Sequence, residues 1–108
     1  MIFVKRGDRR PTAPATIKRG STVVDLTSAT SVTFKMRPMY RLDLTVDTAA
    51  TVLVAASGTV EYRWAAGDTD TAGDYFAEWE VLWSDGTTET FPTIDYDVVH
   101  ISSVLDGS

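Results

Sequence analysis

Residues 59–92 read TVEYRWAAGDTDTAGDYFAEWEVLWSDGTTETFP and decide the fold. Apolar side chains alternate with charged ones over residues 59–64 and again over residues 74–83, which is the period of a half-buried β-strand. Gly67 ends the first run, and the Asp-Gly dipeptide at residues 85–86 suits a hairpin turn after the second. The stretch therefore predicts a strand, a corner, a long strand, a tight turn and a further strand, and it contains no catalytic motif.

The connection between the two alternating runs contains DTAGDY at residues 70–75. It resembles the tyrosine corner of immunoglobulin-like sandwiches, in which a Tyr at the start of a late strand bonds to backbone upstream of it. We expect Asp68 and Gly73 to shape this corner. We also expect the hydroxyl of Tyr75 to bond to backbone near residues 68–71.

Short strands separated by turn residues recur along the whole chain of 108 residues, as in β-sandwiches and barrels. The sequence predicts strands at residues 2–5, 15–19 (with a short extension at 23–26), 31–37, 42–46, 51–55, 59–64, 74–83, 87–91 and 95–101. The predicted fold is all-β, an immunoglobulin-like antiparallel β-sandwich, with residues 1–108 as a single domain and no helix longer than about two turns. The side chains expected in its core are Val32, Phe34, Met36, Val60, Tyr62, Trp64, Tyr75, Ala77, Trp79 and Val81.

Positive and negative side chains occupy different parts of the sequence. Residues 1–41 carry nine of the ten basic side chains and a net charge of +7, whereas residues 42–108 carry −12. We interpret this split as strands of opposite charge that pair across one sheet. Lys35 and Arg37 are expected to face acids of the long strand, namely Glu78 and Glu80. The overall charge of −5 argues against a nucleic-acid partner.

Four cations gather at the first predicted strand and the loop that follows it: Lys5, Arg6, Arg9 and Arg10. A loop of this kind suits docking against an acidic patch on a neighbouring protein. A solvated, mobile loop explains the same pattern equally well, because surface charge alone is weak evidence of an interface.

The residues that could carry chemistry each have a simpler explanation. The acids at positions 68 and 70 resemble the start of a calcium loop, but Trp79 stands where the bidentate Glu is required. His100 is the only histidine and Cys is absent, so a zinc site lacks ligands, and nothing places His100 near Ser84. Glu78 and Glu80 have the pattern of a solvated strand face rather than of a glycosidase pair. We therefore predict no catalytic residue, no metal and no cofactor.

The tryptophans offer one binding alternative. Trp64, Trp79 and Trp83 could form a platform on which sugars stack, but all three fall on faces that the alternation assigns to the core. We favour the core interpretation. The sequence contains no apolar run of the ~18 residues that a membrane span needs.

Four segments in fixed order cover nearly the whole chain: FVKRGDRRP at 3–11, VVDLTSATSVTFKMRP at 23–38, GTVEYRWAAGDTDTAGDYFAEWEV at 58–81 and DGTTETFP at 85–92. Together they resemble the immunoglobulin-like N-terminal domain of tailed-phage baseplate upper proteins, which also occurs as short stand-alone phage or prophage proteins. The chain departs from this pattern at residues 93–96, where the family usually has a polar Asn/Asp-Gly-Tyr turn.

The resemblance implies a structural or adaptor subunit of a virion, most often in the tail or baseplate, without catalysis. Its partners would be other virion proteins in a symmetric multi-copy assembly, with no membrane and no nucleic acid. It would fold in the host bacterial cytoplasm and work in the virion. A carbohydrate-binding surface module and a capsid decoration or head–tail neck protein stay open as alternatives.

Overall fold

A computed structural model describes residues 1–105 of the chain. Within them the only helix is a single 3-10 turn at Ala55–Ser57. The remaining elements are strands: β1 (Ile2–Lys5), β2 (Ala13–Thr16), β3 (Lys18–Arg19), β4 (Thr22–Val23), β5 (Ala29–Pro38), β6 (Val46–Ala49), β7 (Thr51–Val54), β8 (Thr59–Tyr62), β9 (Gly73–Trp83), β10 (Thr88–Phe91) and β11 (Asp97–Ser102).

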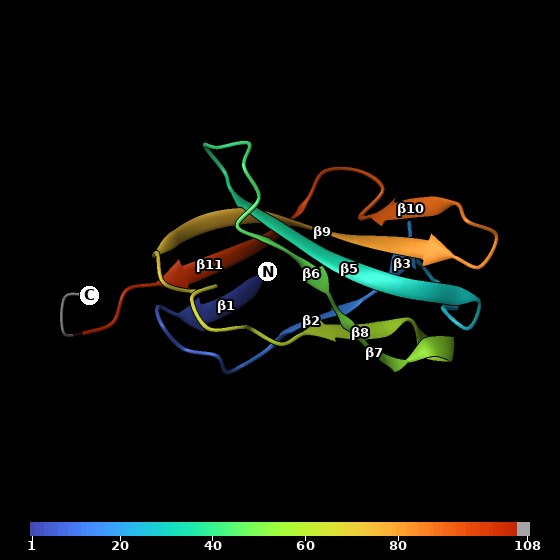
Figure 1. The fold of residues 1–108 in the computed structure, drawn as a ribbon, viewed down its shortest axis with the longest axis horizontal. Coiled ribbons are helices and arrows are strands. Elements are labelled where there is room, and N and C mark those ends of the chain that lie inside the picture. Colours follow the sequence, from blue (N-terminus) through green and yellow to red (C-terminus); the bar gives the residue numbers. More distant parts are fainter. Residues whose placement is uncertain (106–108) are drawn as a thin grey trace.

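The strands form two packed layers (Figure 1). The larger sheet has the order β1-β11-β9-β5-β6, with β10 paired to the other end of β9, and the smaller sheet has the order β2-β8-β7. These sheets correspond to the GFC and BED sheets of immunoglobulin domains. The predicted immunoglobulin-like antiparallel sandwich is thus confirmed, with one parallel pair, between β1 and β11.

Alternation along the strands fills the space between the sheets with apolar side chains. All ten predicted core residues are buried, each at most 3% exposed. Phe34 lies at the centre, with its ring centroid 4.8 Å from that of Tyr62 and 4.7 Å from that of Trp79. The aromatic cluster therefore joins β5 and β9 of one sheet to β8 of the other.

Several predicted strand boundaries are wrong: the strand expected at residues 15–19 is divided into β2 and β3, and the strand expected at residues 59–64 ends at Tyr62. The ladder between β5 and β6 begins at Val46, opposite Met36. Thr45 still donates its amide to the carbonyl of Met36, but residues 42–45 are not in a strand. The last strand begins at Asp97 instead of residue 95, because Asp95 adopts a φ of +62°, which is incompatible with an extended chain.

The predicted neighbours β5 and β9 pair directly, in a register that separates the two predicted ion pairs. Lys35 lies opposite Glu78 and its Nζ contacts Glu80 Oε2 at 3.2 Å. Arg37 instead lies opposite Phe76, and its guanidinium stacks 5.3 Å from the centre of that ring. The prediction is therefore confirmed for Lys35 and wrong for Arg37, because an aromatic side chain occupies the facing position.

Candidate docking surfaces

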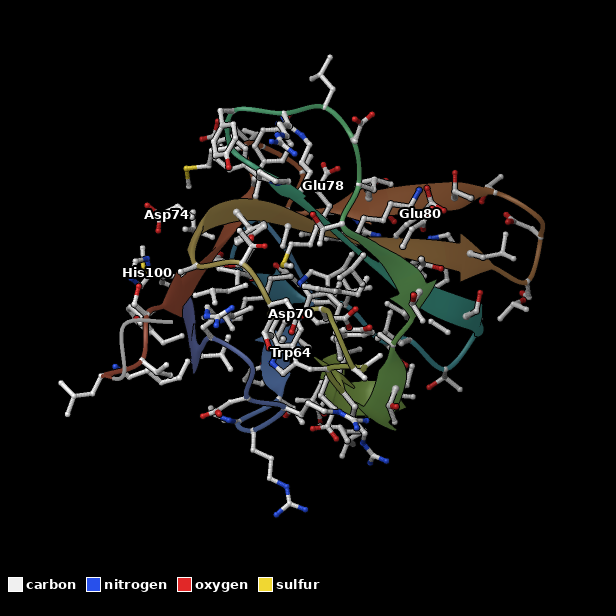
Figure 2. The ribbon with its side chains drawn as sticks, turned by 60° about the vertical axis from the view of Figure 1, so that its left-hand side comes forward. Trp64, Asp70, Asp74, Glu78, Glu80 and His100 are labelled. Carbon is white, nitrogen blue, oxygen red and sulfur yellow. The ribbon has the colours of Figure 1, made fainter. Side chains whose placement is uncertain are left out.

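The loop at residues 6–12, termed the basic loop, connects β1 to β2 and lies against the corner at residues 64–71. Arg6 donates from Nη1 to the carbonyl oxygen of Asp70 at 2.7 Å. Arg9 donates from Nε to the carbonyl oxygen of Trp64 at 2.9 Å. Trp64 and Asp70 are labelled close together in Figure 2. Two of the four cations predicted to dock are thus engaged within the chain itself.

The backbone of the basic loop is fastened to the same corner. The amide of Gly7 donates to the carbonyl of Thr69 at 2.9 Å, and the hydroxyl of Thr69 donates to the carbonyl of Asp8 at 2.8 Å. The indole of Trp64 donates to the carbonyl of Pro11 at 3.0 Å. Thr69 is the only polar side chain fully buried in the described part of the chain. The basic loop is therefore a structural strap.

The other two cations of the predicted cluster are less engaged. Lys5 donates from Nζ to the carbonyl oxygen of Ser103 at 3.3 Å on the surface. Arg10 is exposed and makes no polar side-chain contact with the described residues. Of the four cations predicted to dock, Lys5 and Arg10 are therefore the two that remain candidates for docking through charge.

The corner has the predicted tyrosine geometry. The hydroxyl of Tyr75 donates to the carbonyl oxygen of Thr71 at 2.6 Å, which confirms the expected bond. Gly73 has a φ of +146°, a value that side chains with a Cβ rarely adopt, and it sets the direction of β9. Burial is the main reason why the pKa of Tyr75 is raised.

Asp68 holds the start of the corner. Its Oδ2 accepts the amide of Ala65 at 2.8 Å and the hydroxyl of Tyr62 at 2.5 Å. Burial, followed by this contact with a carboxylate, raises the pKa of Tyr62 to about 12. The carboxylate thus has a structural partner set, as expected for an Asp-rich turn.

Three further acids, Asp74, Glu78 and Glu80, lie along β9 of the larger sheet. His100 contacts Asp74 through Nδ1, whereas Glu78 and Glu80 lie further along β9 (Figure 2). Within residues 1–105, no three His, Asp or Glu side chains converge as a metal site would require. Two of these acids form ion pairs, Asp74 with His100 and Glu80 with Lys35.

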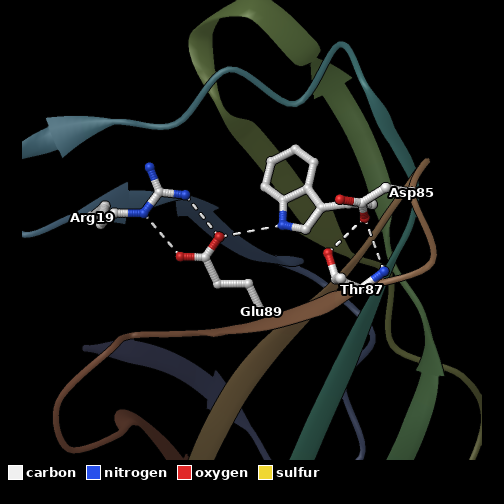
Figure 3. Close-up of polar contacts among 5 residues, drawn as sticks. Arg19, Asp85, Thr87 and Glu89 are labelled. Carbon is white, nitrogen blue, oxygen red and sulfur yellow. Dashed lines mark hydrogen bonds and ion pairs between the residues drawn. The ribbon is translucent and has the colours of Figure 1, made fainter.

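The tryptophans do not form an exposed platform. Trp64 and Trp79 are 1% and 2% exposed, which confirms the core interpretation for both. Trp83 is half-buried, and its indole donates to Glu89 at 3.2 Å. Glu89 also accepts two hydrogen bonds from Arg19 (Figure 3), the main reason why the pKa of this carboxyl is lowered. The strands β3 and β4, which form a separate two-stranded sheet, are thereby attached to β10.

A surface that the sequence reasoning missed lies at one end of the larger sheet. Two loops, at residues 39–45 and 92–96, project from the same side of the molecule (Figure 1). Leu42 is 86% exposed, Ile94 78% and Tyr40 76%. We term these apolar side chains the end patch: Tyr40, Leu42, Leu44, Ile94 and Tyr96.

Arg37 connects the two loops of the end patch. Its Nη1 donates to the carbonyl oxygen of Arg41 at 2.7 Å, and its guanidinium lies 5.6 Å from the ring centre of Tyr96. That ring in turn packs at 4.7 Å against Phe76, and Leu44 and Tyr96 line one small hollow. One signal in the sequence could have indicated this surface: the apolar residues Leu42 and Leu44 follow Pro38, which ends β5.

Comparisons with family models, curated proteins and solved structures found no match to this chain. No helix in the described residues is long and apolar enough to cross a membrane. Function must therefore be argued from the surfaces themselves.

Proposed function

We propose that the chain is a structural adaptor subunit of a tailed-bacteriophage or prophage virion, at the tail or baseplate, and that it acts by docking to neighbouring proteins. The four sequence segments that resemble baseplate upper proteins support the proposed location in the tail or baseplate. The immunoglobulin-like sandwich supports the mechanism, since a rigid frame of this kind presents loops and strand edges in fixed positions.

The end patch is the observation that carries the docking proposal. Three of its side chains, Tyr40, Leu42 and Ile94, have more than three quarters of their surface exposed. Leu44 and Tyr96 line one hollow between the two loops, and apolar side chains exposed on adjoining loops are typical of protein interaction sites. Arg37 orders the two loops before any partner arrives, which lowers the entropy cost of binding.

The carbohydrate-binding alternative depends on exposed tryptophan rings, and Trp64 and Trp79 are buried. A capsid decoration protein or a neck protein would need a docking surface of the same kind, but it would lie at a different position in the virion. Repetition in a symmetric particle would strengthen a weak contact at any of these positions.

The test is the protein composition of purified particles from the source phage or induced prophage. The chain should co-purify with tail proteins through a density gradient, at a constant ratio to them. Labelled subunits should appear at the tail or baseplate in micrographs. A chain found only in the free lysate fraction would contradict the proposal, and label on the head would favour decoration.

A further inference from the structure

The smaller sheet lacks a strand that immunoglobulin frames supply. In such domains a first strand, A, lies beside strand B in the sheet that also contains E and D. Here the first strand, β1, pairs with β11 in the larger sheet, and the smaller sheet consists of β2, β8 and β7 alone. Within residues 1–105, no strand pairs with the outer edge of β2.

The backbone of β2 presents hydrogen-bonding groups at that edge. Ile17 donates its amide to the carbonyl of Gly58, on the side of β8, so Ala13 and Ala15 also direct their backbone groups to β8. The amide and carbonyl of Thr16 and the carbonyl of Pro14 therefore point outward. Pro14 stands at a position where its missing N–H removes no bond from the ladder.

Two adjoining hollows run along this edge. A cavity of about 500 Å³ is lined by Ile2 and Phe3 of β1 and by residues of β2. A second, of about 290 Å³, shares Thr16 with the first and continues to Phe91 and Trp79. The hollows thus form a groove beside β2 with an apolar floor.

Trp79 lines the second hollow, and its indole nitrogen is a buried donor. Trp79 is 2% exposed, and its Nε1 has no hydrogen-bond partner among the described residues. A buried N–H that stays unpaired destabilises the fold by its full desolvation cost. Because this nitrogen has no accessible surface, a segment in the groove contacts other atoms of Trp79, which lines the second hollow.

Charge indicates which kind of segment fits. Residues 1–19, which build β1, the basic loop, β2 and β3, contain six basic side chains and one acid, a net charge of +5. Lys18 lines the second hollow, and Lys5 and Arg10, together with the acid Asp8, line a further small hollow beside β1. Asp97 is the only acid that lines the groove. An acidic segment complements this edge, whereas a basic one does not.

We propose that the groove beside β2 binds an extended, acidic segment of a partner protein, which adds to the smaller sheet as the absent strand. Main-chain bonds to Thr16 and to the carbonyl of Pro14 supply the pairing. This site lies at the side of the sandwich and does not depend on the end patch.

The probe is a blocked nine-residue peptide of alternating glutamate and valine, titrated into the ¹⁵N-labelled protein. The indole N–H resonance of Trp79, assigned with Trp79→Phe, should shift, while that of Trp83 should stay in place because Glu89 holds it. The matching lysine and valine peptide should not bind. No shift of the Trp79 resonance at about 1 mM peptide, or equal binding of the lysine peptide, overturns the proposal.

Variants separate edge pairing from general stickiness. Thr16→Pro removes an outward N–H and should weaken binding about tenfold, with an unchanged circular dichroism spectrum. Lys18→Glu should also weaken binding, whereas Arg41→Glu, the same charge change far from the groove, should not. Unchanged affinity in both groove variants overturns the proposal. A Trp79 shift that follows protein concentration without peptide overturns it in favour of a second copy of the chain.

Discussion

The basic loop and the loop at residues 39–45 have the same length, but the charged loop is bonded to the fold and the apolar loop is exposed to solvent. The first is rich in arginine, yet its side chains and backbone are bonded to the corner at residues 64–71. The second is rich in leucine, yet Leu42 is 86% exposed. The charge and hydropathy of the residues therefore do not predict which of the two loops is exposed.

The difference arises from what lies beside each loop. The corner offers unpaired carbonyls at Trp64 and Asp70, and arginine is well suited to reach them through its five donors. The loop at residues 39–45 lies beyond the end of β5, so no strand or second layer covers its apolar side chains. A change in the basic loop or in the residues it contacts should therefore destabilise the fold more than a matched change at an uncovered position.

The largest difference in the free energy of unfolding is expected for Trp64, whose indole is bonded to the basic loop. Trp64→Ala removes a fully buried ring and the bond to Pro11, and it should lower the free energy of unfolding by about 3–5 kcal/mol. Leu42→Ala should change it by less than about 0.5 kcal/mol, as for exposed positions. Urea denaturation measures both, and similar losses would show that the open loop is packed after all.

A smaller difference is expected for single hydroxyls. Thr69→Val keeps the shape but leaves the carbonyl of Asp8 without its donor, at a cost of about 1–2 kcal/mol. Thr45→Val in the open loop should be close to neutral. Hydrogen exchange at Gly7, whose amide bonds to Thr69, should accelerate in the first variant. An unchanged rate would mean that the strap does not depend on this bond.

The stability contributed by the contact between Tyr62 and Asp68 should also fall at high pH. The pKa of Tyr62 is raised from 10.0 to about 12, so its contribution to stability is complete below pH 10 and is lost as the pH rises through 12. The melting temperature should therefore fall over this range, and less steeply in Tyr62→Phe. A residual slope is expected from Tyr75, whose pKa is also raised. Equal slopes would contradict the role of the Tyr62–Asp68 contact.

The smallest difference separates two neighbouring arginines. Arg9→Ala removes the bond to the carbonyl of Trp64 and should cost roughly 0.5–1.5 kcal/mol. Arg10→Ala removes no polar contact and should stay within about 0.5 kcal/mol of the parent. Thermal melts of the two variants, measured together, decide whether the basic loop is a strap. A larger loss for Arg10→Ala would reverse the assignment.

The fold was largely predictable because alternation in long strands reports burial directly. The runs in β5, β8 and β9 each have one apolar face, and the ten core residues follow from it. The Tyr75 corner was predictable for a different reason, since its residues are adjacent in the sequence. Pairing between β5 and β9 followed from the order of strands in immunoglobulin sandwiches.

The docking surfaces were not predictable from the same signals. The roles of Arg6 and Arg9 depend on carbonyls more than fifty residues away, which no local pattern reports. The end patch depends on where β5 stops and on the positive φ of Asp95. The groove beside β2 depends on which sheet β1 joins, a choice between two edges that its four residues do not encode.

The most direct test of the adaptor proposal is the incorporation of two matched variants into particles. Leu42→Asp places a charge in the end patch, and Leu53→Asp makes the same change at an exposed position on the edge strand β7. Both variants should melt within a few degrees of the parent protein, because both side chains are exposed. The Leu42 variant should be reduced at least about tenfold in purified particles, because a buried unpaired charge opposes docking, whereas the Leu53 variant should incorporate normally. Normal incorporation of the Leu42 variant would contradict docking through the end patch.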